Sequence, residues 1–249
     1  MDPSQMSAIL NVNTIKVAVI LPAYNEEQTI AATIREFYQY LPEASIWVIN
    51  NRSSDATEQT ALDILSGLDC MGGVLNERRP GKGNAVWRAF LDIDADIYVL
   101  ADADSTYPAI QARELMAPII AGESDMVVWD RHSSGKYAAA NKRALHRFGN
   151  RLVRGLVNKL FHAKLTDIMS GYRVFNRRFV KSYPILAEGF EIETDMTLHA
   201  LDKRFRILEL PIDYRERPEG NRTYPNSARS RPCRICRVSR ISSTLRAPD

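Results

Sequence analysis

Residues 16–21, Lys-Val-Ala-Val-Ile-Leu, form a short apolar run with β-branched side chains, and Pro22 ends it. A run of this length and composition is typical of a strand buried on both faces, as in a parallel sheet. Apolar residues then recur at helical spacing over 30–41, and residues 45–50, Ser-Ile-Trp-Val-Ile-Asn, indicate a second buried strand. Residues 55–58, Asp-Ala-Thr-Glu, resemble a capping box that opens the next helix.

The same alternation continues over the next 70 residues or so of the chain. Further strands are predicted at 73–75, 96–101 and 125–129, with helices at 83–91 and 109–121 between them. Strands interleaved with helices predict an α/β fold, in which a mostly parallel sheet is flanked by helices on both faces.

Ligands of such sheets bind beyond the carboxyl ends of the strands. The loops that follow Leu21, Ile49 and Leu100 are therefore expected to meet in one crevice. Reactive side chains in these loops would then lie close together, although they are far apart in the sequence.

The pattern changes after residue 136. A long amphipathic helix is predicted over 137–161, and residues 206–210 predict a last strand. We expect the apolar stripe of the helix to pack on the sheet, because a stripe at this spacing is usually a core face. The stripe consists of Leu145, Phe148, Leu152, Leu156 and Leu160.

Composition places the chain among ordinary globular proteins, because its 249 residues are 45% apolar and 25% charged. The three cysteines, Cys70, Cys233 and Cys236, do not make a disulfide framework, and the last two lack partners for a zinc site. No apolar stretch is long enough to span a bilayer, and the first residues lack the features of an export signal. We expect a cytoplasmic protein, with attachment to the cytoplasmic face of the membrane as the alternative.

The last 29 residues, 221–249, differ in composition from the rest. They carry seven arginines against one acidic residue, Asp249, so the remainder of the chain is acidic although the whole has a formal charge of +3. A solvated, disordered tail is one interpretation, and a peripheral contact with anionic lipid or phosphate is the other. No nucleic-acid-binding fold accompanies the tail, so a nucleic-acid partner is not expected.

Residues 99–108, Val-Leu-Ala-Asp-Ala-Asp-Ser-Thr-Tyr-Pro, hold the most informative polar pattern. An apolar strand delivers Asp102 and Asp104 to its carboxyl end, where both carboxylates can reach one ligand. Hard oxygen ligands suit Mg²⁺ or Mn²⁺ that bridges a diphosphate. A nucleotide sugar needs such an ion to neutralise the departing nucleoside diphosphate. The same pattern by itself also occurs in solvated turns.

Four further segments accompany this acidic pattern: 22–27 (Pro-Ala-Tyr-Asn-Glu-Glu), 50–57 (Asn-Asn-Arg-Ser-Ser-Asp-Ala-Thr), 79–84 (Arg-Pro-Gly-Lys-Gly-Asn) and 167–173 (Asp-Ile-Met-Ser-Gly-Tyr-Arg). In order and spacing the five segments resemble family 2 glycosyltransferases. The branch they resemble is typified by dolichyl-phosphate mannosyltransferase and the bacterial polyprenyl-phosphate sugar transferases. The resemblance covers about residues 15 to 220.

The resemblance implies a nucleotide-sugar-binding domain of the GT-A type over residues 1–220, followed by the basic tail. It implies metal-dependent transfer of a hexose from a UDP- or GDP-hexose to a polyprenyl or dolichyl phosphate, or to a related cell-surface precursor. Mg²⁺ or Mn²⁺ would be the cofactor.

The resemblance also assigns the donor site, residue by residue. Asp102 would reach the ribose or the metal, Asp104 would ligate the metal directly, and Lys82 would place a charge near phosphate. The donor-binding residues it implies are Pro22, Ala23, Tyr24, Glu26, Asn50, Asp55, Lys82, Asp102, Ala103 and Asp104.

An acidic residue near the reacting centre is implied within residues 189–195, where Asp195 matches best and Glu193 is the reserve. It would take the proton of a hydroxyl acceptor, whereas with a phosphate acceptor it would orient groups or balance charge. An acidic helix start is the structural alternative. Basic residues that match the family's phosphate-binding or acceptor-binding positions are Arg131, Arg173, Arg215 and Arg217.

Three positions depart from the family pattern. Asn50 stands where an acidic residue is usual, which would alter recognition of the nucleobase. Trp129 stands where glycine is usual, and an indole that filled part of the donor site would leave the chain inactive. After Gly220 the pattern is lost, as in a reading-frame change or a truncated end, which genomic DNA would settle.

Two other functions remain as alternatives. A sugar-phosphate nucleotidyltransferase would need a glycine-rich phosphate loop directly after the first strand, where this chain has residues 22–27 instead. A degenerate, non-catalytic relative of the glycosyltransferases is the second alternative. A serine hydrolase is not supported, because no G-x-S-x-G pattern is present.

Overall fold

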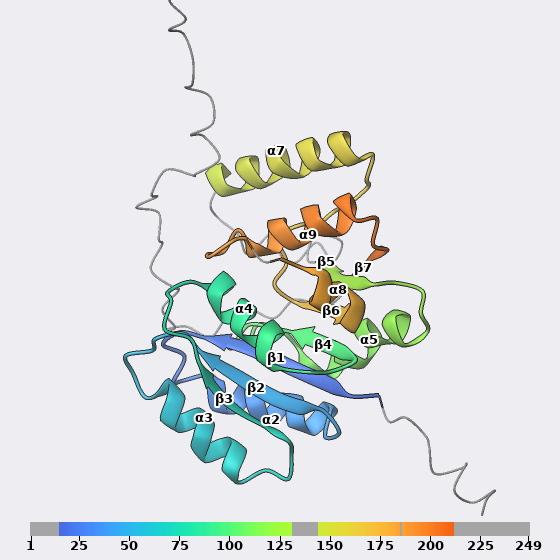
Figure 1. Ribbon diagram of the computed structural model, residues 1–249. Coiled ribbons are helices and arrows are strands. Elements are labelled where there is room, and N and C mark those ends of the chain that lie inside the picture. Colours follow the sequence, from blue (N-terminus) through green and yellow to red (C-terminus); the bar gives the residue numbers. More distant parts are fainter. Residues whose placement is uncertain (1–14, 131–143, 185, 212–249) are drawn as a thin grey trace, which may run out of the picture.

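The computed structural model describes residues 15–130, 144–184 and 186–211 (Figure 1). Within these residues one sheet runs in the order β3-β2-β1-β4-β6-β5-β7. Its strands are β1 (Val17–Ala23), β2 (Ser45–Asn50), β3 (Gly72–Asn76), β4 (Ile97–Leu100), β5 (Met126–Asp130), β6 (Arg173–Asn176) and β7 (Ile207–Pro211).

Helices alternate with the strands, as the sequence predicts for the first 130 residues. The helices are α2 (Ile30–Tyr40), α3 (Thr57–Ser66), α4 (Lys82–Asp92), the 3₁₀ turn η1 (Ala109–Gln111), α5 (Ala112–Ile120), α7 (Ala144–Phe161), α8 (Arg177–Ser182) and α9 (Ile192–Asp202). No helix in the described part of the chain is both long and apolar enough to cross a bilayer.

Strand pairing is parallel throughout the sheet except around β6, which pairs antiparallel with both β4 and β5. The carboxyl ends of β1, β2 and β4 therefore lie at one edge, as predicted. Because β6 runs the other way, its first residue lies at that edge, with Arg173 opposite Leu100. The chain therefore reaches the crevice just before β6, whereas elsewhere it reaches the crevice just after a strand.

The core has two layers, one on each face of the sheet. Along β1, Val17, Val19 and Leu21 pack on one face with α2, α3 and α5, while Ala18 and Ile20 pack on the other with α4, α8 and α9. Burial on both faces explains why β1 is apolar along its whole length instead of alternating with polar residues. The result is a three-layer α/β/α arrangement (Figure 1).

The prediction that the stripe of the long helix packs on the sheet is wrong for its last three leucines. Leu152, Leu156 and Leu160 are more than half exposed in α7, whereas Val157 between them is buried. Figure 1 shows why: α7 lies outside α9, which separates it from the sheet.

Asp125 joins three strands at the end of the sheet far from the crevice. Its carboxylate accepts hydrogen bonds from the backbone and guanidinium of Arg206, just before β7, and from the side chain of Asn176 in β6. Burial alone would raise the pKa of Asp125, but the hydrogen bonds from Arg206 and Asn176 outweigh it and lower the pKa to about 2.

Replacing this carboxylate will weaken the fold in a pH-dependent way. Because the pKa of Asp125 lies below its unfolded value, the ionised group adds about 2 kcal/mol of stability above pH 5, which disappears as the pH falls towards 2. Urea unfolding of Asp125→Asn at pH 7 should show a loss of this size, and the difference from the parent chain should narrow at lower pH. Asp202→Asn, at an exposed position, is the control and should unfold like the parent.

Candidate functional site

The loop after β1 and the loop after β2 interlock through side chain to backbone hydrogen bonds. Thr57 Oγ1 accepts from the backbone N–H of Glu26 at 2.7 Å, and Asp55 Oδ2 accepts from that of Glu27 at 3.3 Å. In return, Glu27 Oε2 accepts from the backbone N–H of Ala56 at 2.9 Å. The prediction that these two loops meet is confirmed.

Of the donor-site residues predicted in the first loop, Tyr24 and Glu26 lie at this junction. The predicted end of the strand at Pro22 is wrong, because Pro22 and Ala23 are the last residues of β1 and pair with β2. Pro22, Ala23 and Glu26 are buried and Tyr24 is half-buried. Glu26 Oε2 accepts a hydrogen bond from Thr29 Oγ1 at the start of α2. Glu26 thus ties the loop to the helix that follows it.

The expected capping box is wrong, because α3 begins at Thr57 and has no side-chain cap. Asp55 Oδ1 accepts instead from the backbone N–H and hydroxyl of Thr57. The carboxylate of Glu58 turns towards the sheet, where it accepts from the amides of Asn50 at 3.0 Å and Asn76 at 2.6 Å. Asn50 Nδ2 also donates to Asn76 Oδ1 at 2.7 Å. Asn50 is therefore held beside a carboxylate that comes from α3.

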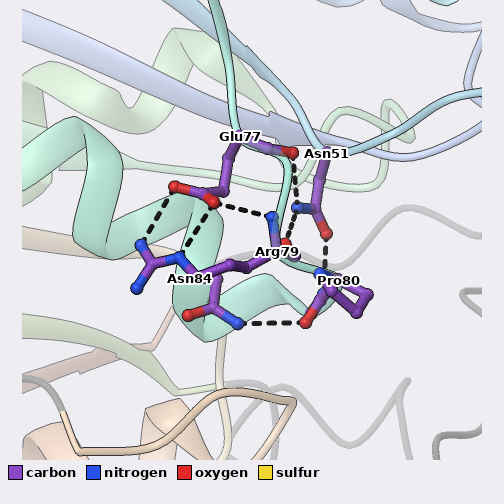
Figure 2. Close-up of polar contacts among 6 residues, drawn as sticks. Asn51, Glu77, Arg79, Pro80 and Asn84 are labelled. Atoms are coloured by element: carbon purple, nitrogen blue, oxygen red, sulfur yellow. Dashed lines mark hydrogen bonds and ion pairs between the residues drawn. The ribbon is translucent and has the colours of Figure 1, made fainter.

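Asn51 fastens the loop between β3 and α4, and Figure 2 shows its contacts. Its amide nitrogen donates to the backbone oxygens of Arg79 at 2.7 Å and Glu77 at 3.4 Å, and its amide oxygen accepts from Gly81 N–H at 2.8 Å. In the same loop the guanidinium of Arg79 pairs with the Glu77 carboxylate and lies 4.3 Å from the centre of the Trp87 ring. These bonds fix the backbone that leads into Lys82.

Lys82, the first residue of α4, is the centre of the site. Its side chain is buried, and Nζ lies 2.5 Å from Asp102 Oδ1 and 2.6 Å from Glu193 Oε1. Burial works to lower the pKa of Lys82, but the charges of Asp102 and Glu193 outweigh it and raise that pKa well above its usual value. Lys82 therefore carries its charge at neutral pH and joins the acidic loop after β4 to α9.

Two glycines allow these segments to approach. A Cβ on Gly171, in the loop before β6, would lie 2.9 Å from both Lys82 Nζ and the hydroxyl of Tyr107, and 3.1 Å from Asp102 Oδ2. A Cβ on Gly83 would lie only 2.0 Å from the backbone oxygen of Ala187. The start of α4 therefore packs backbone to backbone against the segment that precedes α9.

The loop that carries the two predicted metal ligands is held by α2. Thr33 Oγ1 donates to the backbone oxygen of Ala103 at 3.1 Å and shares a hydrogen bond with the Ser105 hydroxyl at 2.9 Å. Asp104 is buried, and its Oδ1 accepts from both the N–H and the hydroxyl of Thr106. Asp102 is about a third exposed at its side chain, which gives a ligand access from the crevice.

The donor set at Asp102 and Asp104 fits Mg²⁺ or Mn²⁺ that arrives with a diphosphate. Among the described residues, no group of three or more His, Cys, Asp and Glu side chains is arranged to hold a metal ion. These two carboxylates would thus leave most of the coordination shell to phosphate oxygens and water. Mg²⁺ is commonly held in this way by one or two carboxylates together with substrate phosphates.

The structure separates the two acidic residues that the sequence offers as catalytic groups. Glu193 is buried against Lys82, inside the site. Asp195 instead accepts a hydrogen bond of 2.5 Å from the hydroxyl of Tyr183, at the end of α8. Burial and this hydrogen bond raise the pKa of Tyr183 above its usual value. Of the two, Glu193 is the one brought to Asp102.

Arg173, predicted to bind phosphate, is completely buried below the crevice. Its guanidinium donates to the backbone oxygens of Ile168 and Ser170 and to the hydroxyl of Thr197 in α9. These bonds shape the loop before β6. The other three predicted arginines, Arg131, Arg215 and Arg217, lie outside the described residues, as does the basic tail.

Trp129, at the position where glycine was expected, is fully buried in β5. Its indole packs edge-on against the rings of Tyr107 and Tyr172, at centroid distances of 5.1 and 6.0 Å. The indole belongs to the core on the α2 face of the sheet and fills space beneath the loop of Tyr107.

Sequence reasoning missed three residues that position the site: Thr33, Asn51 and Glu58. Asn51 lies within a recognised segment, but its role depends on the backbone of a loop about 30 residues away. Thr33 and Glu58 lie within helical patterns and carry no local signal of function.

Comparison with known proteins identifies relatives that carry out sugar transfer. The family described as Glycosyl transferase family 2 matches residues 18–183. Glycosyltransferase AglJ of Haloferax volcanii is 32% identical over 208 residues, which cover 83% of this chain and 65% of that protein. Polyprenol monophosphomannose synthase of Mycolicibacterium smegmatis is 25% identical over 217 residues, covering 83% of this chain and 80% of that protein.

A solved structure has the same fold. Glucosyl-3-phosphoglycerate synthase from Mycobacterium tuberculosis, crystallised with Mn²⁺, uridine diphosphate and phosphoglyceric acid, matches with a TM-score of 0.64 and 26% identity, over 82% of this chain and 72% of that one. The predicted fold class, an α/β domain of the GT-A type with a mostly parallel sheet flanked by helices, is confirmed. The chain belongs to family 2 of the glycosyltransferases.

Proposed function

We propose that this glycosyltransferase moves a hexose from a UDP- or GDP-hexose to a polyprenyl phosphate or a related lipid-linked precursor, with Mg²⁺ or Mn²⁺. The observation that carries the proposal is the meeting of Asp102, Lys82 and Glu193 at the edge where the loops after β1, β2 and β4 converge. A buried cation and two carboxylates at this edge suit a diphosphate and its metal.

The relatives support the choice of donor and acceptor. The name of the Mycolicibacterium smegmatis relative states a polyprenol monophosphomannose product, and the Mycobacterium tuberculosis structure holds Mn²⁺ and uridine diphosphate. The chain spans 65% of the length of AglJ, so the acceptor rests on these likenesses and on the chemistry of the site. Enzymes that act on lipid phosphates work at a membrane, so a lipid-phosphate acceptor favours the second location expected from the sequence, the cytoplasmic face of the membrane, over a purely cytoplasmic one.

The donor would lie with its nucleoside over the loops of Tyr24 and Asp55 and its diphosphate towards Lys82. Asp102 and Asp104 would hold the metal, which when bound neutralises charge on the leaving diphosphate. Lys82 adds a fixed positive charge in a buried setting, where electrostatic stabilisation of a developing negative charge is strongest. Asn50 and Glu58 together would face the base.

Glu193 is our proposed acidic group at the reacting centre, ahead of Asp195. A hydroxyl acceptor would give its proton to the Glu193 carboxylate as attack develops. A phosphate acceptor is already ionised, and Glu193 would then hold Lys82 in place through their 2.6 Å contact. Asp195, bonded to Tyr183, would instead fix α9 against α8.

Removing the Asp104 carboxylate should weaken metal-dependent donor binding. We expect Asp104→Ala to bind UDP or GDP at least about tenfold more weakly in the presence of Mn²⁺, because one of the two protein ligands of the metal is gone. Titration calorimetry with both nucleotides measures this. Asp63→Ala, an exposed change on α3, is the control. Nucleotide binding that ignores both Mn²⁺ and Asp104→Ala would rule out the proposed function and favour the non-catalytic alternative.

The two acidic residues of α9 can be told apart by kinetics. Glu193→Gln should lower kcat by about 100-fold or more, the usual scale for a group that moves a proton or fixes charge at the reacting centre. Asp195→Asn should leave kcat within about threefold and lower thermal stability, because it weakens the bond to Tyr183. Transfer of radiolabelled hexose to undecaprenyl phosphate provides the assay. The reverse order of effects would restore Asp195 as the catalytic group.

A further inference from the structure

Lys82 engages the same carboxylate that we propose as a metal ligand. Its ammonium has three N–H donors, and two of them reach Asp102 Oδ1 and Glu193 Oε1. The Lys82 and Glu193 side chains are almost wholly buried, whereas Asp102 is partly open to the crevice. A metal ion that binds the exposed part of the Asp102 carboxylate therefore comes close to the Lys82 ammonium, which contacts Oδ1 of the same group.

A divalent cation that reaches Asp102 in the donor-free protein meets repulsion from this ammonium. The repulsion is strong because buried charges are poorly screened by water and salt. The cation also meets a carboxylate, Asp102, whose negative charge is already balanced by Lys82. Nucleoside diphosphate changes this balance, because its negative charges can accept both the metal and the Lys82 ammonium.

The geometry points to Lys82 as the residue that couples metal binding to donor binding. In the donor-free protein Lys82 occupies Asp102 and keeps the affinity for a lone metal ion low. When the diphosphate arrives, the ammonium shares its charge with phosphate oxygens and Asp102 becomes available to the metal. This inference rests on the proposed function, and it adds an order of events to that site.

No side chain of the loop before β6 comes between Lys82 and Asp102 at Gly171. Gly171 has no side chain, and any Cβ there would crowd both Lys82 Nζ and Asp102 Oδ2. Glu193 is a second, buried partner, so the ammonium keeps one buried ion pair while its contact with Asp102 weakens. Asn51 and Asn84 hold the backbone around Lys82, so the change is confined to the end of its side chain.

Coupling of this kind is reciprocal. If nucleotide raises the affinity for metal by a given factor, metal must raise the affinity for nucleotide by the same factor. The inference therefore predicts that two substitutions have opposite effects on the affinity for metal in the absence of nucleotide. Removing the positive charge of Lys82 should favour the lone metal, whereas removing the negative charge of Glu193 should disfavour it.

The test measures binding of Mn²⁺ alone, nucleotide alone and both together by titration calorimetry and by electron paramagnetic resonance of free Mn²⁺. Lys82→Gln should bind Mn²⁺ alone about tenfold more tightly than the parent and bind UDP or GDP alone more weakly. Glu193→Gln should have the opposite effects. It should bind UDP or GDP without metal more tightly than the parent and bind Mn²⁺ alone more weakly. The matched control, Lys203→Gln, changes an exposed lysine paired with Asp202 and should follow the parent.

Unchanged or weaker Mn²⁺ binding by folded Lys82→Gln overturns the coupling. If Lys82→Gln fails to fold, Glu193→Gln provides the test. The coupling is then overturned if Glu193→Gln binds UDP or GDP without metal no more tightly than the parent does. The parent chain separates this result from the proposed function. A parent that binds no nucleotide even with Mn²⁺ refutes the proposed function, whereas a parent that binds both with the wrong response to the variants refutes only the role of Lys82.

Discussion

The buried ion pair network of Lys82 with Asp102 and Glu193 is the interaction on which the site depends. Taking one ammonium and a carboxylate out of water is costly, and the cost is offset only when the charges meet at hydrogen-bond distance. Here three distant segments supply the partners: the start of α4, the loop after β4 and the first turn of α9. Loss of Lys82 would leave the buried Glu193 carboxylate without this partner, and loss of either carboxylate would leave the Lys82 ammonium with one partner in place of two.

The sequence was sufficient to locate the central strands of the sheet. Parallel strands covered on both faces are apolar throughout, so β1, β2 and β4 could be found from composition alone. β6 could not, because its four residues, Arg173 to Asn176, begin and end with polar side chains that are satisfied by distant segments. The leucines of α7 were misjudged for a related reason: a helical stripe shows that a face is apolar, not what lies against it.

In the site, the sequence motifs identified the charged residues that form ion pairs, but not the residues that position the surrounding loops. Lys82 and Asp102 stand in recognisable segments and the structure brings them together. Asn51 and Thr33 act on backbone atoms far along the chain, a relation that residue order does not encode. The choice between Glu193 and Asp195 depended on helical phase: two positions along a helix turn a side chain by about 200°, so only one can face Lys82.

The contact of Gly83 with the backbone of Ala187 limits how far α4 and the segment before α9 can move relative to each other. Peptide groups that pack directly on each other resist relative movement, since no flexible side chain lies between them to yield. With the Lys82 to Glu193 bridge beside it, this contact joins the half of the crevice made by β1, β2 and α4 to the half made by α9. Rotation of these two halves against each other would have to break both the backbone contact and the buried ion pair, so the contact favours a crevice of fixed shape.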